Sequence, residues 1–182
     1  MGKRLRLFVA AFPPPERAAS WFQHARGLLP PGLKLPDPAS VHLTLVFLGE
    51  RDERELPQLT ESVRRGAAGI TAFSLLPREL RMLPERGQPR LLAVITDAPG
   101  QLLELQRRLA SRLAQDKGKE RSPFLPHLTI ARFAGKTVER TSLAIAREPM
   151  EIRTIALVQS HLLPEGAKYE VLDRVELSGS ET

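Results

Sequence analysis

The feature that most constrains the fold is a tetrapeptide that occurs twice, as HLTL at residues 42–45 and as HLTI at residues 127–130. With four His and nine Thr in 182 residues, chance would give about 0.2 His-x-Thr triplets, so two with matching apolar flanks are informative. The copies lie about half a chain length apart, and each follows a proline-containing loop. We therefore predict two related halves that each contribute one copy to a shared groove.

Both copies are predicted to open β-strands, over residues 41–48 and from His127 onward. On a strand, residues i and i+2 share a face, so His42 and Thr44 point one way while the leucines between and after them point into the core. The same holds for His127 and Thr129. Each strand should therefore be anchored by its apolar side and present an imidazole beside a hydroxyl on the other.

The rest of the chain mixes helical and strand patterns without a regular βαβ rhythm, which favours an α+β fold with largely antiparallel sheets over a doubly wound parallel sheet. The length of 182 residues is that of one compact domain. Strands are predicted at 4–12, 41–48, 71–83, 91–96, from 127 onward, 152–163 and 169–177, and helices over 15–29, 56–67, 102–113 and 138–146.

Composition excludes several kinds of chemistry. Cysteine is absent, which excludes disulfides, thiol nucleophiles and thiolate metal sites. The net charge of +6 permits an anionic partner, but it also fits an ordinary solvated surface. No apolar run approaches the roughly 18 residues of a membrane span, and the apolar stretch near the start is too short for a signal peptide. We therefore expect a cytoplasmic protein without a membrane partner.

Two His/Thr pairs across a gap of about one phosphate would supply what in-line displacement at phosphorus requires. One neutral imidazole takes a proton from the attacking water, and one imidazolium gives a proton to the departing sugar oxygen. The threonine hydroxyls would stabilise the charge on the non-bridging oxygens. A zinc site is disfavoured, because two distant histidines without cysteines or a His-x-x-x-His pair leave too few ligands. No Gly-x-Ser-x-Gly elbow supports a nucleophilic serine.

The segments VHLTLVFLGE and PFLPHLTIARF, together with the opening RLFVAAFPPPE and the closing TIALVQSHLLPEGAKYEVL, resemble the 2H phosphoesterase superfamily. The resemblance is to its RNA 2',3'-cyclic phosphodiesterases, also called 2'-5' RNA ligases, and it covers nearly the whole chain. It implies a single domain over residues 1–182, built from two intertwined, pseudo-twofold duplicated lobes. Each lobe would hold an antiparallel sheet flanked by helices, with the active site in the central groove.

The resemblance also implies an activity and residue roles. The family opens a 2',3'-cyclic phosphate at an RNA 3' end to leave a 2'-phosphate, without a metal or cofactor. By motif matching, His42 would be the general acid, His127 the general base, and Thr44 and Thr129 the phosphate-binding residues, although the near symmetry of the motifs leaves the acid and base interchangeable. Arg132 matches an arginine that binds phosphate in relatives. Strict alternation puts it on the face opposite His127, so a bulge, a strand end or a long reach would be required.

Three other functions remain open for the same residues. The site could join tRNA halves reversibly through a 2'-5' linkage, hydrolyse small cyclic nucleotides, or, in a different class, hold an RNA end without turnover. We expect a monomer. His24 and His161 lack a paired threonine and are predicted to be structural. Phe47 is predicted to lie in the core with the leucines of its motif, whereas Phe133, on the His127 side, could stack a terminal base.

Overall fold

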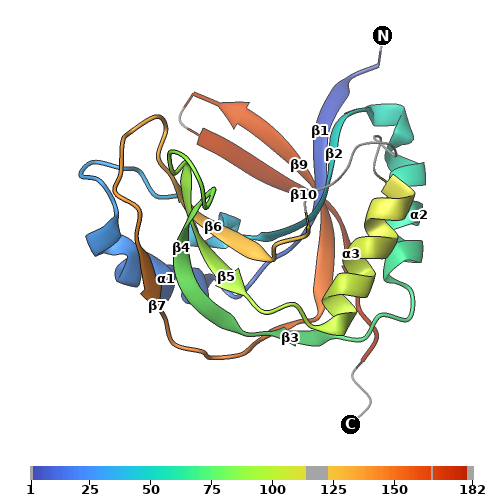
Figure 1. Ribbon diagram of the computed structural model, residues 1–182. Helices are drawn as coiled ribbons and strands as arrows, with labels where there is room; N and C mark the ends of the chain where they lie inside the picture. The colour runs from blue at the N-terminus through green and yellow to red at the C-terminus, as the bar shows by residue number, and fades with distance from the viewer. Residues whose placement is uncertain (1, 114–122, 165, 180–182) are drawn as a thin grey trace.

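The structure is a computed structural model that describes residues 2–113, 123–164 and 166–179 (Figure 1). Its main feature is an eight-stranded sheet in the order β10-β9-β1-β2-β6-β5-β4-β7, and β3 and β8 form a separate two-stranded sheet. All neighbouring strands run antiparallel. In chain order the elements are β1 Arg4–Ala11, α1 Pro15–Ala25, β2 Leu43–Asp52, α2 Leu56–Ala67, β3 Phe73–Leu75, β4 Pro77–Leu83, β5 Leu91–Thr96, α3 Gly100–Leu113, β6 His127–Arg132, β7 Ser142–Ala144, β8 Met150–Ile152, β9 Thr154–Leu163 and β10 Gly166–Glu176.

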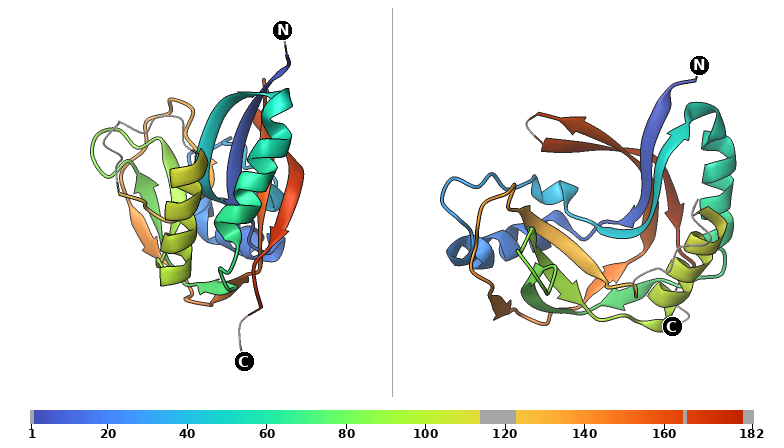
Figure 2. Two further views of the ribbon diagram at one scale, coloured as in Figure 1. Left: turned by 90° about the vertical axis from the view of Figure 1, so that its right-hand side faces the viewer. Right: turned by 45° about the horizontal axis from the view of Figure 1, so that its top comes forward.

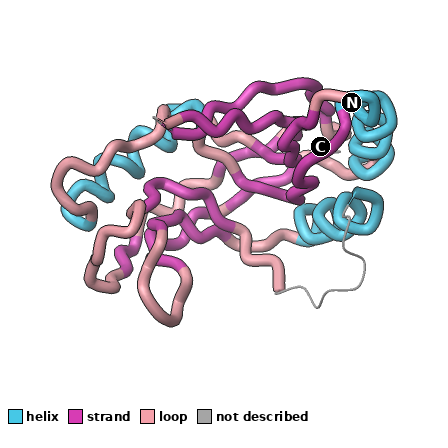
Figure 3. The backbone as a smooth tube through the Cα atoms, turned by 90° about the horizontal axis from the view of Figure 1, so that it is seen from above, coloured by secondary structure: helices cyan, strands magenta, loops and turns pink. Residues whose placement is uncertain are grey.

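The helices are divided between the two ends of the molecule. Helix α1 lies at one end, and α2 and α3 lie side by side at the other (Figure 3). The close packing of α2 on α3 depends on Gly66, since a Cβ at this position would lie 2.8 Å from the Leu109 Cδ2 atom. Pro57 lies in the first turn of α2, where a missing N–H costs no helical hydrogen bond. None of the helices in the three described ranges is long and apolar enough to cross a membrane.

The sheet is buried on both faces near its centre. The main core contains side chains of all three helices and one face of the strands. A smaller cluster lies on the opposite face, so that β1 is buried on both sides from Leu7 onward. This second cluster consists of Phe8, Ala10, Ala156 and Val158, with Phe12 and Tyr169 packed against it.

The predicted α+β fold with antiparallel strands is confirmed, and two groups of four strands join in one continuous sheet: β10-β9-β1-β2, from the two ends of the chain, and β6-β5-β4-β7, from its middle. They meet where β2 lies beside β6, the two strands that carry the repeated tetrapeptide. The predicted strand over 71–83 is divided into β3 and β4 at Leu76. There the side chain of Asp97 accepts a hydrogen bond from the Leu76 N–H at 2.8 Å, and the Asp97 N–H donates to the Leu76 carbonyl at 3.0 Å.

The predicted helix over 138–146 is wrong. This segment is extended, and Ser142–Ala144 form β7 at the edge of the sheet, with Leu143 opposite Leu80 of β4. Without β7, that edge of β4 would present unpaired backbone groups. Residues 142–144 therefore form a strand paired with the edge of β4, because the helical pattern over 138–146 has too few apolar positions to stabilise a helix.

Candidate active site

The repeated tetrapeptides come together in the middle of the eight-stranded sheet, on neighbouring antiparallel strands (Figure 2). Leu43 of β2 is paired with Leu128 of β6. One step along this register in either direction places His42 opposite Thr129 and Thr44 opposite His127. The leucines are buried in the main core, and the histidines and threonines are partly exposed on the other face. The structure thus brings His42, Thr44, His127 and Thr129 together on one face of the sheet.

The two imidazoles lie diagonally across the strand pair. Diagonal neighbours on one face of an antiparallel pair are roughly 7–8 Å apart, and directly opposite residues roughly 5 Å. A group the size of a phosphate therefore fits between His42 and His127. The threonine hydroxyls then flank the same space from the other diagonal.

Both histidines are oriented by the same contact. The Nδ1 atom of His42 lies 2.8 Å from the carbonyl oxygen of Ser40, and that of His127 lies 2.8 Å from the carbonyl oxygen of Leu125. In each case Nδ1–H donates to a carbonyl two residues earlier. This hydrogen bond fixes the tautomer and leaves Nε2 free to accept or donate a proton.

The surroundings of His42 are aromatic. Its ring centroid lies 4.8 Å from that of Phe8, 5.6 Å from that of Phe12 and 4.9 Å from that of Tyr169, which meets it edge-on. Burial among these rings lowers the pKa of His42, and the hydrogen bond to Ser40 acts in the opposite direction. The positive charges of Arg132 and His127 lower the pKa further, in keeping with their position close to His42.

This pKa shift predicts a pH-dependent stability. Because the pKa of His42 in the folded protein is below its usual value of 6.5, the unfolded chain takes up this proton first as the pH falls. The folded protein therefore favours the neutral form of His42. Its contribution to the free energy of unfolding is fully present above pH 6.5 and is lost as the pH falls below that value. We expect His42→Gln to reduce the loss of stability between about pH 7.5 and about pH 5, measured by urea unfolding at each pH.

The matched control for this prediction is His24→Gln. His24 is exposed on α1, where its Nδ1 bonds to the carbonyl of Ser20 at 2.8 Å. This variant removes an imidazole outside the ring cluster around His42, so its pH dependence is the reference with which His42→Gln is compared. An unchanged dependence in His42→Gln would contradict the prediction.

A β-bulge in each motif strand changes which side chains face the site. In β2, Val9 pairs with Val46 but Ala10 pairs with Thr44, so one residue is extra and both Leu45 and Val46 are buried. The alternation is reversed beyond this point. Phe47 therefore lies on the site face and is 65% exposed, 6.1 Å from Phe8 between ring centroids. The prediction that Phe47 belongs to the core is wrong.

The bulge of β6 occurs at the same place in the second motif. Thr129 pairs with Ala93 but Ala131 pairs with Leu92, and Ile130 and Ala131 are both buried. Because of this bulge, Arg132 falls on the same face as His127. A bulge is one of the features that the predicted role of Arg132 requires. The next residue, Phe133, is moved into the main core with 0% exposure. The prediction that Phe133 could stack a base is therefore wrong.

The other two histidines have hydrogen-bond partners outside the candidate site. His24 bonds within α1, and the Nε2 atom of His161 lies 3.0 Å from Glu170 on the adjacent strand β10. Among the residues that the structure describes, no group of three or more His, Cys, Asp or Glu side chains could hold a metal ion.

The aromatic rings around His42 were not predicted from the sequence. Phe8 and Phe12 alternate with the core residues of β1, so the first strand is apolar on both faces. That pattern indicates a strand that is covered on both faces, and it could have been used to predict aromatic side chains beside His42. Tyr169 carries no such signal, because its proximity to His42 depends on the pairing of β10, β9 and β1.

Comparison with known proteins gives a consistent result. A family model described as the 2'-5' RNA ligase superfamily matches residues 13–162. An RNA 2',3'-cyclic phosphodiesterase of Thermus thermophilus is 33% identical over 96% of this chain and 91% of its own length. A protein of the same name from Archaeoglobus fulgidus is 29% identical over 78% of this chain and 82% of its own.

Solved structures share the fold. The crystal structure of TT0787 from Thermus thermophilus superposes with a TM-score of 0.83 at 32% identity, covering 97% of this chain and 100% of the other. Escherichia coli LigT, in a structure complexed with 3'-AMP, superposes with a TM-score of 0.81 at 23% identity, covering 97% and 99%.

Proposed function

The chain belongs to the 2'-5' RNA ligase superfamily, and from this premise we propose that it hydrolyses 2',3'-cyclic phosphates at RNA 3' ends to 2'-phosphates, without a metal. Relatives that cover most of the chain are named RNA 2',3'-cyclic phosphodiesterases. The observation that carries the proposal is the arrangement of the four side chains on the strand pair: His42 and His127 lie on one diagonal, and Thr44 and Thr129 lie on the other.

The proposed reaction uses both imidazoles at one phosphorus atom. Nε2 of His127 takes a proton from a water molecule, whose oxygen attacks phosphorus. The bond from phosphorus to the 3'-oxygen breaks on the opposite side, and Nε2–H of His42 gives that oxygen its proton. One water is consumed, the 2'-oxygen keeps the phosphate, and the two histidines end with their protons exchanged.

The remaining side chains stabilise charge at phosphorus. The hydroxyls of Thr44 and Thr129 donate to the non-bridging oxygens, and the Arg132 guanidinium offers a charged fork to the same atoms. The cyclic phosphodiester carries one negative charge, which favours the imidazolium of His42 and opposes the effect of burial on its pKa. The exposed ring of Phe47 provides a surface on which a terminal base can stack.

The direct test is product identity in the presence of EDTA. A short RNA ending in a 2',3'-cyclic phosphate is incubated with the purified protein, and the phosphorus resonances are followed by NMR. We expect conversion to the 2'-phosphate at a rate that EDTA leaves unchanged. Absence of turnover, a 3'-phosphate product, or loss of activity in EDTA would each overturn the proposal.

A further inference from the structure

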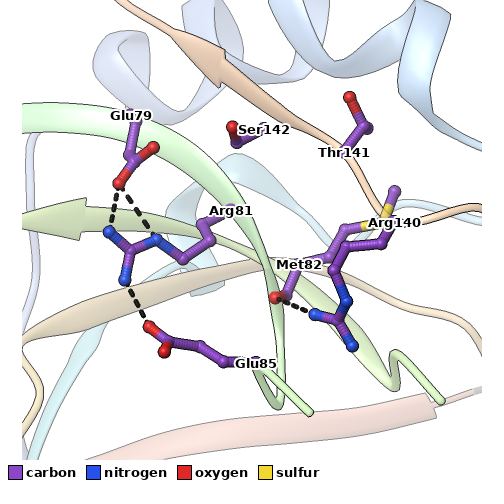
Figure 4. Close-up of a pocket in the computed structure, with 7 residues that line it drawn as sticks. All are labelled: Glu79, Arg81, Met82, Glu85, Arg140, Thr141 and Ser142. Carbon is purple, nitrogen blue, oxygen red and sulfur yellow. Dashed lines mark hydrogen bonds and ion pairs between the residues drawn. The ribbon is translucent and has the colours of Figure 1, made fainter. Parts of the chain in front are cut away.

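A cavity of about 520 Å³ lies beside strands β4 and β7. Its polar lining consists of Glu79, Arg81, Glu85, Arg140, Thr141 and Ser142 (Figure 4).

The strand register puts this cavity on the same face of the sheet as the candidate active site. Thr129 of β6 pairs with Ala93 of β5, Ala93 with Arg81 of β4, and Arg81 with Ser142 of β7. Residues directly opposite one another share a face. The two neighbours of Arg81 in β4, Leu80 and Met82, are buried in the main core. Arg81 therefore lies on the opposite face of the sheet, as Thr129 does. With strands about 4.8 Å apart, Arg81 lies roughly 10 Å from Thr129 across the sheet.

The charged groups of the cavity are already paired. The Nε atom of Arg81 donates to Oε1 of Glu79 at 2.9 Å, and its Nη2 donates to the same oxygen. Its Nη1 donates to Oε1 of Glu85 at 2.6 Å (Figure 4). The Arg140 guanidinium donates to the backbone carbonyls of Met82, Pro84 and Gly87, which fixes the turn after β4.

These contacts decide what kind of ligand fits. Both arginines are engaged, and two arginines balance two carboxylates, so the cavity offers little attraction for a phosphate. The hydrogen bonds of Arg81 use both acceptor sites of the Glu79 Oε1 atom but only one on the Glu85 Oε1 atom, so the Glu85 carboxylate can still accept on each of its oxygens. The hydroxyls of Thr141 and Ser142 add groups that can donate or accept. The cavity therefore suits a flat polar ligand with adjacent N–H donors.

We propose that this cavity binds the base of the nucleotide on the 5' side of the terminal nucleotide and prefers guanine; this inference rests on the proposed function. Guanine presents two neighbouring donors, N1–H and N2–H, which match the open acceptor sites on the two oxygens of the Glu85 carboxylate. Adenine, cytosine and uracil each present a single donor beside an acceptor on the same edge. Arg81 holds both carboxylates in position and is a positioning residue.

The two halves of the sheet then divide the recognition of the RNA end. The half formed by β1, β2, β9 and β10 presents the exposed ring of Phe47, which lies beside the buried Phe8 and suits stacking of the terminal base. The half formed by β6, β5, β4 and β7 presents Arg81 with its two ion-pair partners, Glu79 and Glu85. With the cyclic phosphate between the two motifs, the adjacent nucleotide extends toward Arg81, roughly 10 Å from Thr129.

The test compares substrates and two conservative variants. The substrates are dinucleotides with a constant terminal nucleotide, a 2',3'-cyclic phosphate and G, A, C or U on the 5' side, together with the terminal mononucleotide cyclic phosphate. For the wild-type protein, we expect kcat/KM for the guanine dinucleotide to exceed that for the others by about 5-fold or more, the lower end of what one bidentate base contact contributes. In Glu79→Gln or Glu85→Gln this preference should disappear, while kcat/KM for the mononucleotide stays at the wild-type value.

Glu104→Gln is the matched control. Glu104 lies on α3 and accepts from Arg107 and Arg108, so this variant also removes a carboxylate that pairs with arginine, but outside the cavity. It should retain the preference. Equal rates for all four dinucleotides, a preference that survives both cavity variants, or an equal loss on every substrate would overturn the inference. Turnover of the mononucleotide by the wild-type protein distinguishes these results from failure of the proposed function.

Discussion

Alanine in place of His42 or of His127 is expected to lower kcat for opening of the cyclic phosphate by about 10²–10⁴-fold in each case. Each variant removes one of the two proton transfers, and the threonine hydroxyls that flank the site are poor substitutes for an imidazole near neutral pH. Because a proton shuttle acts in the transition state, binding of the ground state should change much less. Single-turnover rates with a cyclic-phosphate RNA, and titration of the 2'-phosphate product, measure the two quantities separately.

His24→Ala and His161→Ala are the matched controls, since both residues bond within their own element or hairpin. They should keep wild-type rates. The double variant of His42 and His127 should be far less impaired than the product of the single effects, because groups that act as one unit are not additive. A wild-type rate in either single variant would remove that histidine from the mechanism.

A sulfur atom in place of the 3'-oxygen should rescue one histidine variant and not the other. A thiolate leaves without a proton, so the variant that lacks the general acid should regain most of the roughly 10²–10⁴-fold that it lost. With His42 as the acid, we expect rescue of His42→Ala and none of His127→Ala. The measurement is the rate ratio of the sulfur-bridged to the oxygen-bridged cyclic phosphate for the wild-type protein and both variants.

The experiment also tests the opposite assignment of roles. Rescue of His127→Ala alone would reverse the acid and the base and retain the two-histidine mechanism. Rescue of neither variant would contradict a protonated leaving group altogether. Thr129→Ser, which keeps a hydroxyl on the same strand, should show the wild-type ratio and serves as the control.

The parts of the site that could be predicted from the sequence are those governed by local periodicity. The side-chain alternation of a strand puts His42 with Thr44 and His127 with Thr129, and the structure has both pairs on one face. The amphipathic patterns of α2 and α3 and the antiparallel arrangement were likewise predictable, because the apolar spacing and the proline-rich boundaries are strong local signals.

What could not be predicted depends on pairing between distant segments. The bulges that turn Phe47 outward and Phe133 inward are defined by the partners β1 and β5, and nothing in VHLTLVFL or HLTIARF marks the extra residue. The strand Ser142–Ala144 forms because β4 has an open edge, which a helical pattern over 138–146 does not reveal. The ring of Tyr169 reaches His42 only through two successive strand pairings.

The two halves of the eight-stranded sheet are joined through β2 and β6 at one bridged pair of residues, Leu43 with Leu128. Within the described part of this sheet, the other strand pairings lie in one half or the other. That bridge lies between the two motifs, so a change in the angle between the halves at this point would alter the spacing of His42 and His127.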